Sequence, residues 1–341
     1  MTPAPATAPT AAVPAPAAAS PRAEQTPHRT RTQALARWFG IVFVLAVLGL
    51  LVWVAQRVAW SQVLDALAAL PPAVLAAALA VVVLSHVVYS TYDLLGRAWT
   101  GHTLPRRQVM LITFISYAFN LNLGSMVGGI ALRFRLYARR GLPPEVIGRV
   151  FALSLSTNWL GYALLAGGVF LLQLMTPPAD WTVSAAALRI FGAVLWLLVL
   201  AYLVVCGLFA QRSFSIRGHP FTLPPLRMAA LQLLLSCTNW LLISVVVYLL
   251  LQRAVPYGQV LSVYLVAVVA GIILRIPGGL GVLEGVFVAL LAPPLAQHTV
   301  LAALLAYRAM YYLLPLLVAA LLYFVVEARS SAAVNDAAAD T

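Results

Sequence analysis

Lysine is absent from the chain, so all 21 of its Lys and Arg residues are arginine. This absence excludes a Walker A phosphate loop and a lysine Schiff base, because both need the lysine amine. Only two cysteines occur, Cys206 and Cys237, and their spacing fits neither a CxxC motif nor a zinc site. The HExxH and GxSxG motifs are also missing. We therefore expect no metal, no cofactor and no enzymatic activity.

Charge is scarce as well. Charged residues make up 9% of the 341 residues and hydrophobic residues 63%, against about 25% and 45–50% in soluble domains. A soluble fold of this composition would have almost no polar surface. The composition predicts an all-α polytopic membrane protein, with no nucleic-acid partner and no segment polar enough to form a soluble catalytic domain.

The two ends differ from the rest of the chain. Residues 1–35 are rich in Ala, Pro and Thr and cannot bury a core, so we expect a disordered cytoplasmic tail. Residues 329–341 are small or polar and are also expected to be disordered. Residues 36–328 are expected to form a single transmembrane domain.

Apolar runs predict about six full spans and two broken helices. Gly-rich stretches interrupt the broken ones, at 108–132 (NLNLGSMVGG) and 258–293 (PGGLG), because glycine weakens a helix interior. The six runs long enough to cross about 30 Å of hydrocarbon lie at 39–56, 73–95, 150–174, 184–209, 227–251 and 299–326.

The arginine positions predict the orientation. The N-terminal arginines place that end in the cytoplasm. If 108–132 crossed once, the arginines between 133 and 149 would face outside, so we interpret it as a re-entrant hairpin. With 258–293 also re-entrant, each element recurs about 150 residues later from the opposite side. This pattern predicts an inverted repeat, although the first limb, 258–274, is long enough to cross once.

Two motifs carry a family resemblance, NLNLGSMVGGIALRFRLYARRGL at 120–142 and RIPGGLGVLEG at 275–285. Together they resemble the membrane domain of the lysylphosphatidylglycerol synthase and flippase family, most of all its stand-alone bacterial inner-membrane members. The resemblance implies a lipid-handling domain with re-entrant helices. In fused members this domain is held to move aminoacylated phosphatidylglycerol, and a soluble transferase domain follows it. Because this chain ends soon after its last span, we expect no synthase activity.

The stretch RFRLYARRG, which follows the first break, is the first candidate site. Guanidinium groups bind phosphate through two parallel hydrogen bonds, so Arg133 and Arg135 are candidates for holding a lipid phosphate. The alternative is an ordinary basic cluster that sets topology and attracts anionic lipid. For Arg139 and Arg140 we prefer that alternative.

Charges at membrane depth are the second candidate site. An isolated charge near the bilayer centre costs about 2.5–3.5 kcal/mol, so such groups usually pair or face a cavity. Arg275 and Arg308 are of this kind, and Glu284 is either their partner or a helix cap. Asp93 also lies at membrane depth, with Arg97 as its alternative partner one turn on. The mixed signs suit an anionic, zwitterionic or cationic head group.

Uncharged polar residues complete the candidates. Asn120 and Asn122 are expected to cap the broken helix or to line the path. His86 is either a packed polar residue or a proton relay. Tyr311 and Tyr312 are interpreted as interface anchors or packing.

Three functions fit this sequence. The leading one is a lipid translocase that binds phospholipid head groups and anionic lipid. The second is a transporter of a small solute, and the third is a non-transporting, lipid-binding envelope partner. The sequence leaves open whether the chain forms a homo-oligomer.

Overall fold

The computed structural model describes residues 59–174, 184–210, 213–216, 219–274, 281–291 and 295–339, together with scattered positions from 38 to 56. Residues 1–55 form one compact unit and residues 56–341 a second. The predicted tail, 1–35, lies outside the described residues. Of the predicted span 39–56 only scattered positions are described, and these are helical.

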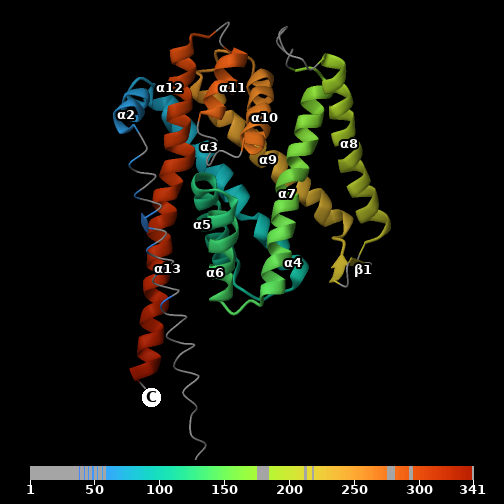
Figure 1. The fold of residues 1–341 in the computed structure, drawn as a ribbon, viewed down its shortest axis with the longest axis vertical. Helices are drawn as coiled ribbons and strands as arrows, with labels where there is room; N and C mark the ends of the chain where they lie inside the picture. The colour runs from blue at the N-terminus through green and yellow to red at the C-terminus, as the bar shows by residue number, and fades with distance from the viewer. Residues whose placement is uncertain are drawn as a thin grey trace, which may run out of the picture. The chain divides into compact units, whose positions relative to one another are not determined.

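In the described residues of the second unit, the regular elements are helices and one short antiparallel strand pair (Figure 1). Two segments, η1 and η3, are π-helical. The elements are α2 (Trp60–Ala68), α3 (Pro72–Ser90), α4 (Tyr92–Thr100), α5 (Arg106–Leu123), η1 (Ser125–Leu132), α6 (Arg133–Ala138), α7 (Pro144–Leu171), α8 (Ala185–Leu208), β1 (Ser213–Ile216), β2 (His219–Thr222), α9 (Leu226–Leu250), α10 (Tyr257–Leu274), α11 (Val282–Leu291), α12 (Gln297–Tyr307), η3 (Arg308–Leu313) and α13 (Leu314–Ala339).

Within the part of the chain that the structure describes, six helical segments are long and apolar enough to cross a membrane. Five of them correspond to predicted spans. The sixth, α10, is the first limb of the second broken region, so that limb is a full-length apolar helix, whereas the second limb, α11, is short. The six segments are Pro72–Thr100, Pro144–Leu171, Ala185–Leu208, Leu226–Leu250, Tyr257–Leu274 and Gln297–Ala328.

The first broken region is a tight helical hairpin. Helix α5 ends at Leu123, and the residue that follows it, Gly124, has a φ of +82°, which favours glycine. The chain then turns back so closely that a Cβ on Gly128 would lie 2.1 Å from the backbone nitrogen of Asn120. Helix α6 returns beside α5, as Figure 1 shows. The glycines are therefore needed for backbone-to-backbone contact as well as for the break.

The last membrane segment, α12–η3–α13, is a long helix with a π-helical turn in its middle. Pro315 follows this turn, and a proline inside a helix removes a backbone N–H and clashes with the preceding turn. The π-helical turn accommodates that proline. Helix α13 continues to Ala339, through residues for which the sequence predicted disorder from 329. The Ala-rich tail has no Gly or Pro that would end the helix.

The membrane-length helices of this unit pack closely against one another. Helices α7 and α9 meet at Gly161, where a Cβ would lie 2.2 Å from the Ser236 Oγ and 2.7 Å from the Cys237 backbone nitrogen. Helix α9 also packs along α3, and α5 contacts α3, η3 and α13. Figure 1 shows α10 and α11 toward one end of this unit and α5 and α6 toward the other.

Candidate functional site

Among the described residues, the most deeply buried charges are Asp93 of α4 and Arg133 at the start of α6. Their side chains are 0% and 3% exposed, and the Arg133 Nε lies 3.5 Å from the Asp93 Oδ2. Tyr137, one turn after Arg133, donates its hydroxyl hydrogen to the same oxygen at 2.8 Å. Among the described residues Asp93 pairs with Arg133 and not with Arg97, whose Nε donates to the carbonyl of Leu104 at 2.7 Å.

This ion pair is not fully satisfied by hydrogen bonds. Among the described residues, neither the Asp93 Oδ1 nor the Arg133 Nε has a hydrogen-bond partner. The Arg133 guanidinium also lies over the Phe151 ring, 5.4 Å from its centroid. An unsatisfied buried polar group costs about 1–3 kcal/mol, and more when it is charged. The pair therefore retains capacity for a further polar ligand.

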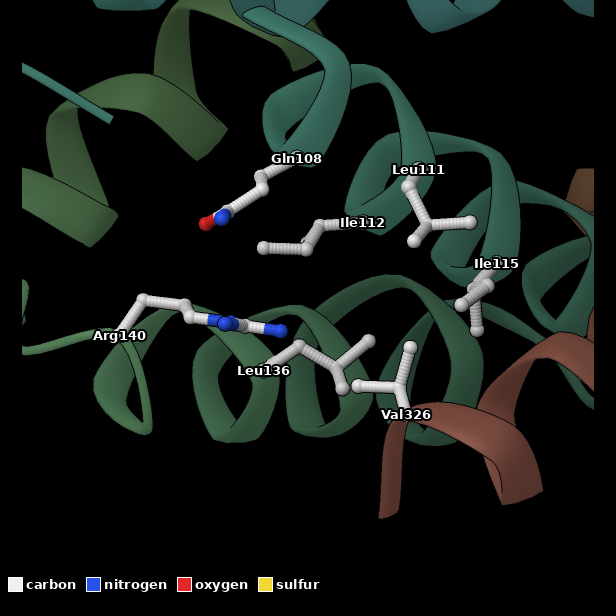
Figure 2. Close-up of a pocket in the computed structure, with 7 residues that line it drawn as sticks. All are labelled: Gln108, Leu111, Ile112, Ile115, Leu136, Arg140 and Val326. Carbon is white, nitrogen blue, oxygen red and sulfur yellow. The ribbon is translucent and has the colours of Figure 1, made fainter. Parts of the chain in front are cut away.

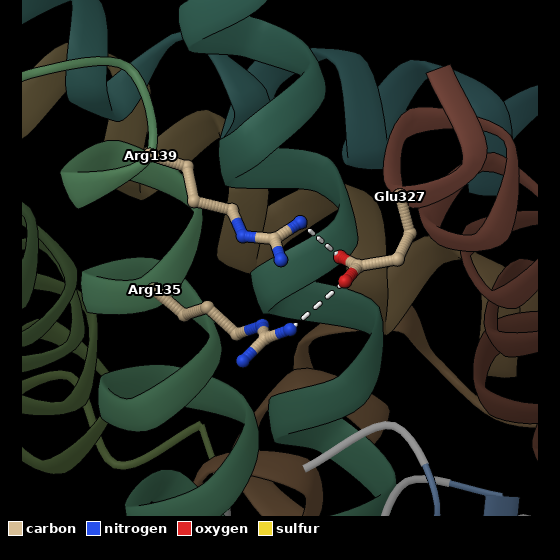
Figure 3. A network of polar contacts seen from close by, with 3 residues as sticks. All are labelled: Arg135, Arg139 and Glu327. Atoms are coloured by element: carbon tan, nitrogen blue, oxygen red, sulfur yellow. Dashed lines mark hydrogen bonds and ion pairs between the residues drawn. The ribbon is translucent and has the colours of Figure 1, made fainter. Parts of the chain in front are cut away.

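Arg135 and Arg139 lie on another face of the same stretch, as their spacing predicts. Both bind the Glu327 carboxylate of α13, at 2.9 Å and 2.5 Å (Figure 3). Arg135, a candidate phosphate ligand by sequence, therefore joins the hairpin to α13. Arg139, for which the sequence favours membership of an ordinary basic cluster, makes the same connection to α13.

The second ion pair joins α11 to the π-helical turn. The Nε and Nη2 of Arg308 both bind the Glu284 carboxylate, with Nη2 2.9 Å from Oε2. The backbone N–H of Gly281 donates to the same Oε2 at 2.9 Å. Glu284 is thus both a cap of α11 and the partner of Arg308, the two alternatives that the sequence offered. Arg275 lies outside the described residues.

The tip of the first hairpin contacts η3. The Asn122 Nδ2 donates to the Ala118 carbonyl at 2.9 Å and to the Tyr312 carbonyl at 3.1 Å. Asn122 therefore links the end of α5 to the backbone of the π-helical turn. Asn120, also at the tip, lies against the returning limb, because a Cβ on Gly129 would come 3.0 Å from its Oδ1.

A chain of buried polar side chains runs between four helical elements. The Ser85 Oγ of α3 donates to the Asn239 Oδ1 of α9 at 2.8 Å. It also lies 2.8 Å from the Tyr311 hydroxyl of η3, which is 3.0 Å from that of Tyr117 in α5. The His86 ring packs on Tyr311, with centroids 4.8 Å apart. Tyr311 is 1% exposed, so it is a core residue and not an interface anchor.

Sequence reasoning did not find the tyrosine cluster at the centre of this chain, in which Tyr117 and Tyr311 meet and the His86 ring packs on both. Its members lie inside apolar runs, where a tyrosine looks like any other aromatic residue. The only available signal was the number of tyrosines placed inside predicted spans and broken helices, away from the interfaces where they are common. His86 lies in this cluster, with its Nδ1 2.9 Å from the Val82 carbonyl.

One titratable side chain near Asp93 lies outside the candidate spans. His102, in the loop between α4 and α5, packs edge-on against Tyr137, with ring centroids 6.3 Å apart. Burial lowers the pKa of its imidazole, and the positive charge of Arg97 lowers it further. The ring is therefore mainly neutral at pH 7.

A pocket opens between α5, α6 and α13 (Figure 2). The space between these residues measures about 270 Å³, which includes its open mouth. Its walls are mainly aliphatic, with one arginine and one amide. The lining residues are Gln108, Leu111, Ile112, Ile115, Leu136, Arg140 and Val326.

Comparison with known proteins shows one matching family and two similar proteins. The family model for the lysylphosphatidylglycerol synthase TM region matches residues 37–319. Inner membrane protein YbhN of Escherichia coli (strain K12) is 45% identical over 300 residues, which cover 87% of this chain and 94% of that protein. The uncharacterized protein slr0712 of Synechocystis is 30% identical over 260 residues, which cover 75% of this chain and 80% of that protein.

Proposed function

The chain belongs to the family of the lysylphosphatidylglycerol synthase transmembrane region, and on that premise we propose that it is a lipid translocase. It acts as a carrier in the bacterial inner membrane and has no enzymatic activity. Its partners are membrane lipids. The polar head group passes through the protein interior while the acyl chains stay in the bilayer.

The observation that carries this proposal is the buried Asp93–Arg133 pair. Arg133 directly follows the broken helix, and its guanidinium geometry suits a phosphate. A lipid phosphate competes with Asp93 for Arg133. When Arg133 leaves, Tyr137 still donates to Asp93, so the carboxylate is never left without a hydrogen bond. This exchange lowers the cost of bringing a charged head group into the membrane interior.

The two broken regions suit alternating access. In our proposal the hairpin of α5, η1 and α6 is re-entrant from the cytoplasmic side. The region of α10 and α11 is its counterpart from the other side, which makes the two halves an inverted repeat. The N-terminus is then cytoplasmic. The Asn122 contact with the Tyr312 carbonyl joins the first hairpin to the segment that carries Arg308, so movement of one broken region is coupled to the other.

A second candidate function also has a specific observation in its favour. Among the described residues, Arg133 and Arg308 each face a carboxylate. Paired charges are what a non-transporting, lipid-binding membrane partner would need for stability alone. In that case these residues maintain the fold and move nothing.

Lipid transfer between leaflets separates the two candidates. The purified protein is placed in liposomes that contain head-group-labelled phosphatidylglycerol, phosphatidylethanolamine or aminoacyl-phosphatidylglycerol, with and without a proton gradient. Arg133→Lys keeps the positive charge but cannot form two parallel hydrogen bonds to a phosphate. We therefore expect this variant to transfer lipid at least about tenfold more slowly than wild type. Its unfolding temperature should equal that of wild type. Asp65→Asn, at an exposed carboxylate on α2, is the control and should transfer lipid normally.

Two outcomes contradict the translocase. One is a folded wild-type protein that moves no labelled lipid under either condition. The other is an Arg133→Lys variant that transfers lipid at the wild-type rate. The first result favours the lipid-binding partner or a transporter of a small solute, and uptake of soluble solutes into the same liposomes distinguishes those two.

A further inference from the structure

We propose that the groove between α5, α6 and α13 is a second lipid site, at which Arg140 binds the phosphate of one anionic phospholipid from the surrounding bilayer. None of the residues that line this groove belongs to the Asp93–Arg133 pair or to the Glu284–Arg308 pair. The lipid bound there is a resident of the protein surface and not the molecule that is moved. The proposal therefore does not depend on translocation.

The first observation concerns the arginines of RFRLYARRG. Arg133 faces Asp93, and Arg135 and Arg139 share Glu327. Within the described parts of the chain, Arg140 is the one arginine of this stretch with no carboxylate partner. Its guanidinium instead lines the pocket. An unpaired guanidinium at the mouth of an apolar groove favours an anionic ligand.

The second observation is the distribution of polarity within the groove. Figure 2 shows the Arg140 guanidinium and the Gln108 amide on one side of the pocket and Leu111, Ile115 and Val326 on the other. A phospholipid has the same order of polarity, with a phosphate at one end and an acyl chain beyond it. Arg140 can hold two phosphate oxygens, and the Gln108 amide group can donate to a third. The aliphatic wall then packs along the chain.

The third observation is the position of the two polar groups along their helices. Gln108 is the third residue of α5, and Arg140 follows the end of α6 by two residues. Both therefore lie where the hairpin begins and ends, at the level of the connecting loops. Lipid phosphates lie at that level of a bilayer, and arginines near helix ends favour it. Ile112 and Leu136 lie one turn further into each helix, at acyl-chain level.

A lipid in this groove would contact α5, α6 and α13 at once. Because it binds only the folded arrangement of α5, α6 and α13, it stabilises that arrangement by an amount that rises with the logarithm of its concentration once the site is mostly filled. Together with the Glu327 contacts of Arg135 and Arg139, the lipid anchors to α13 the end of the hairpin at which α5 begins and α6 ends.

Native mass spectrometry of the full chain tests the site directly. The protein in detergent is titrated with phosphatidylglycerol or with phosphatidylcholine, and the dissociation constant of the first bound lipid is measured. We expect phosphatidylglycerol to bind at least about tenfold more tightly than phosphatidylcholine. Arg140→Ala should remove that preference. Arg107→Ala, at an exposed arginine near the start of α5 and outside the groove, should retain it to within about twofold.

A variant of the apolar wall completes the test. Leu111→Trp fills the groove without changing any charge, and it should weaken the first phosphatidylglycerol site as Arg140→Ala does. All variants are compared with wild type by thermal unfolding without added lipid. Equal loss of binding in Arg140→Ala and Arg107→Ala would overturn the proposal, because general attraction to basic residues would then explain it. Unchanged binding in Arg140→Ala would overturn it as well.

Discussion

Tyr137 donates its hydroxyl hydrogen to the Asp93 carboxylate across 2.8 Å, at the same oxygen that faces Arg133. Tyr137 and Arg133 are four residues apart on one face of α6, and Asp93 belongs to α4. The buried carboxylate is thus held by two groups from a single helical turn. If one of them leaves, the other remains. This arrangement is the basis of the exchange that we propose for a lipid phosphate.

Tyr137→Phe should destabilise the protein. The change removes a hydrogen bond to a buried charged group and alters no other atom, and such bonds contribute about 1.5–3 kcal/mol. Unfolding in detergent, followed by circular dichroism, measures the loss. Tyr248→Phe is the matched control, because no hydrogen bond joins the Tyr248 hydroxyl to another described residue. Equal stability of the two variants would show that the contact with Asp93 is not a strong one.

Asp93→Asn and Arg133→Met should each destabilise the protein more than the two changes combined. Each single change leaves one buried charge without its partner, which costs about 3–5 kcal/mol, whereas the double variant removes both charges. A double-mutant cycle from thermal unfolding gives the coupling energy. Additive effects in the double variant would mean that the two side chains do not interact.

Gly161→Ala should weaken the packing of α7 on α9. The new methyl group would lie 2.7 Å from the backbone nitrogen of Cys237, which cannot move aside alone. Overpacking of this kind costs about 1–3 kcal/mol. Gly148→Ala lies on the same helix with open space around its Cβ, and it should stabilise by up to about 1 kcal/mol. A measured decrease in the unfolding temperature for both variants would contradict this account.

Stability should decrease as the pH falls through the unfolded-state pKa of His102, about 6.5. The folded protein lowers this pKa, first through burial and then through Arg97, so the unfolded chain binds the proton more readily. The contribution is complete above pH 6.5 and is lost below it. His102→Gln removes the titrating group, and unfolding temperatures of both proteins between pH 5 and 8 should then depend less on pH in the variant. Parallel pH profiles would rule out His102.

Cysteine labelling should place the two broken regions on opposite sides of the membrane. Cys206 and Cys237 are first replaced by alanine. Thr103→Cys, before α5, should then react with an impermeant maleimide only from the cytoplasm, and Ala254→Cys, before α10, only from outside. Reaction of both positions from the same side would contradict the inverted repeat and the re-entrant assignment that goes with it.

Several features could be predicted from local sequence. Long apolar runs correctly predict five of the six membrane-length helices, because burial of a helix in hydrocarbon depends mainly on its own composition. The break after Leu123 follows from the glycines around it. The sequence offers Glu284 as a helix cap or as the partner of Arg275 or Arg308, since few acidic residues exist at membrane depth, and the structure shows the pair with Arg308.

The amino-acid sequence by itself determined that the chain is a helical membrane protein, where its apolar helices lie and that glycine interrupts the first hairpin. Only the tertiary structure decided that Asp93 faces Arg133 and not Arg97, that Glu327 holds Arg135 and Arg139, and that Tyr311 lies in the core. The physical reason is the distance along the chain over which each effect acts. Hydropathy and glycine act within one helix, whereas the partner of a buried charge depends on which helices pack together, and periodicity along one helix carries no information about its neighbours.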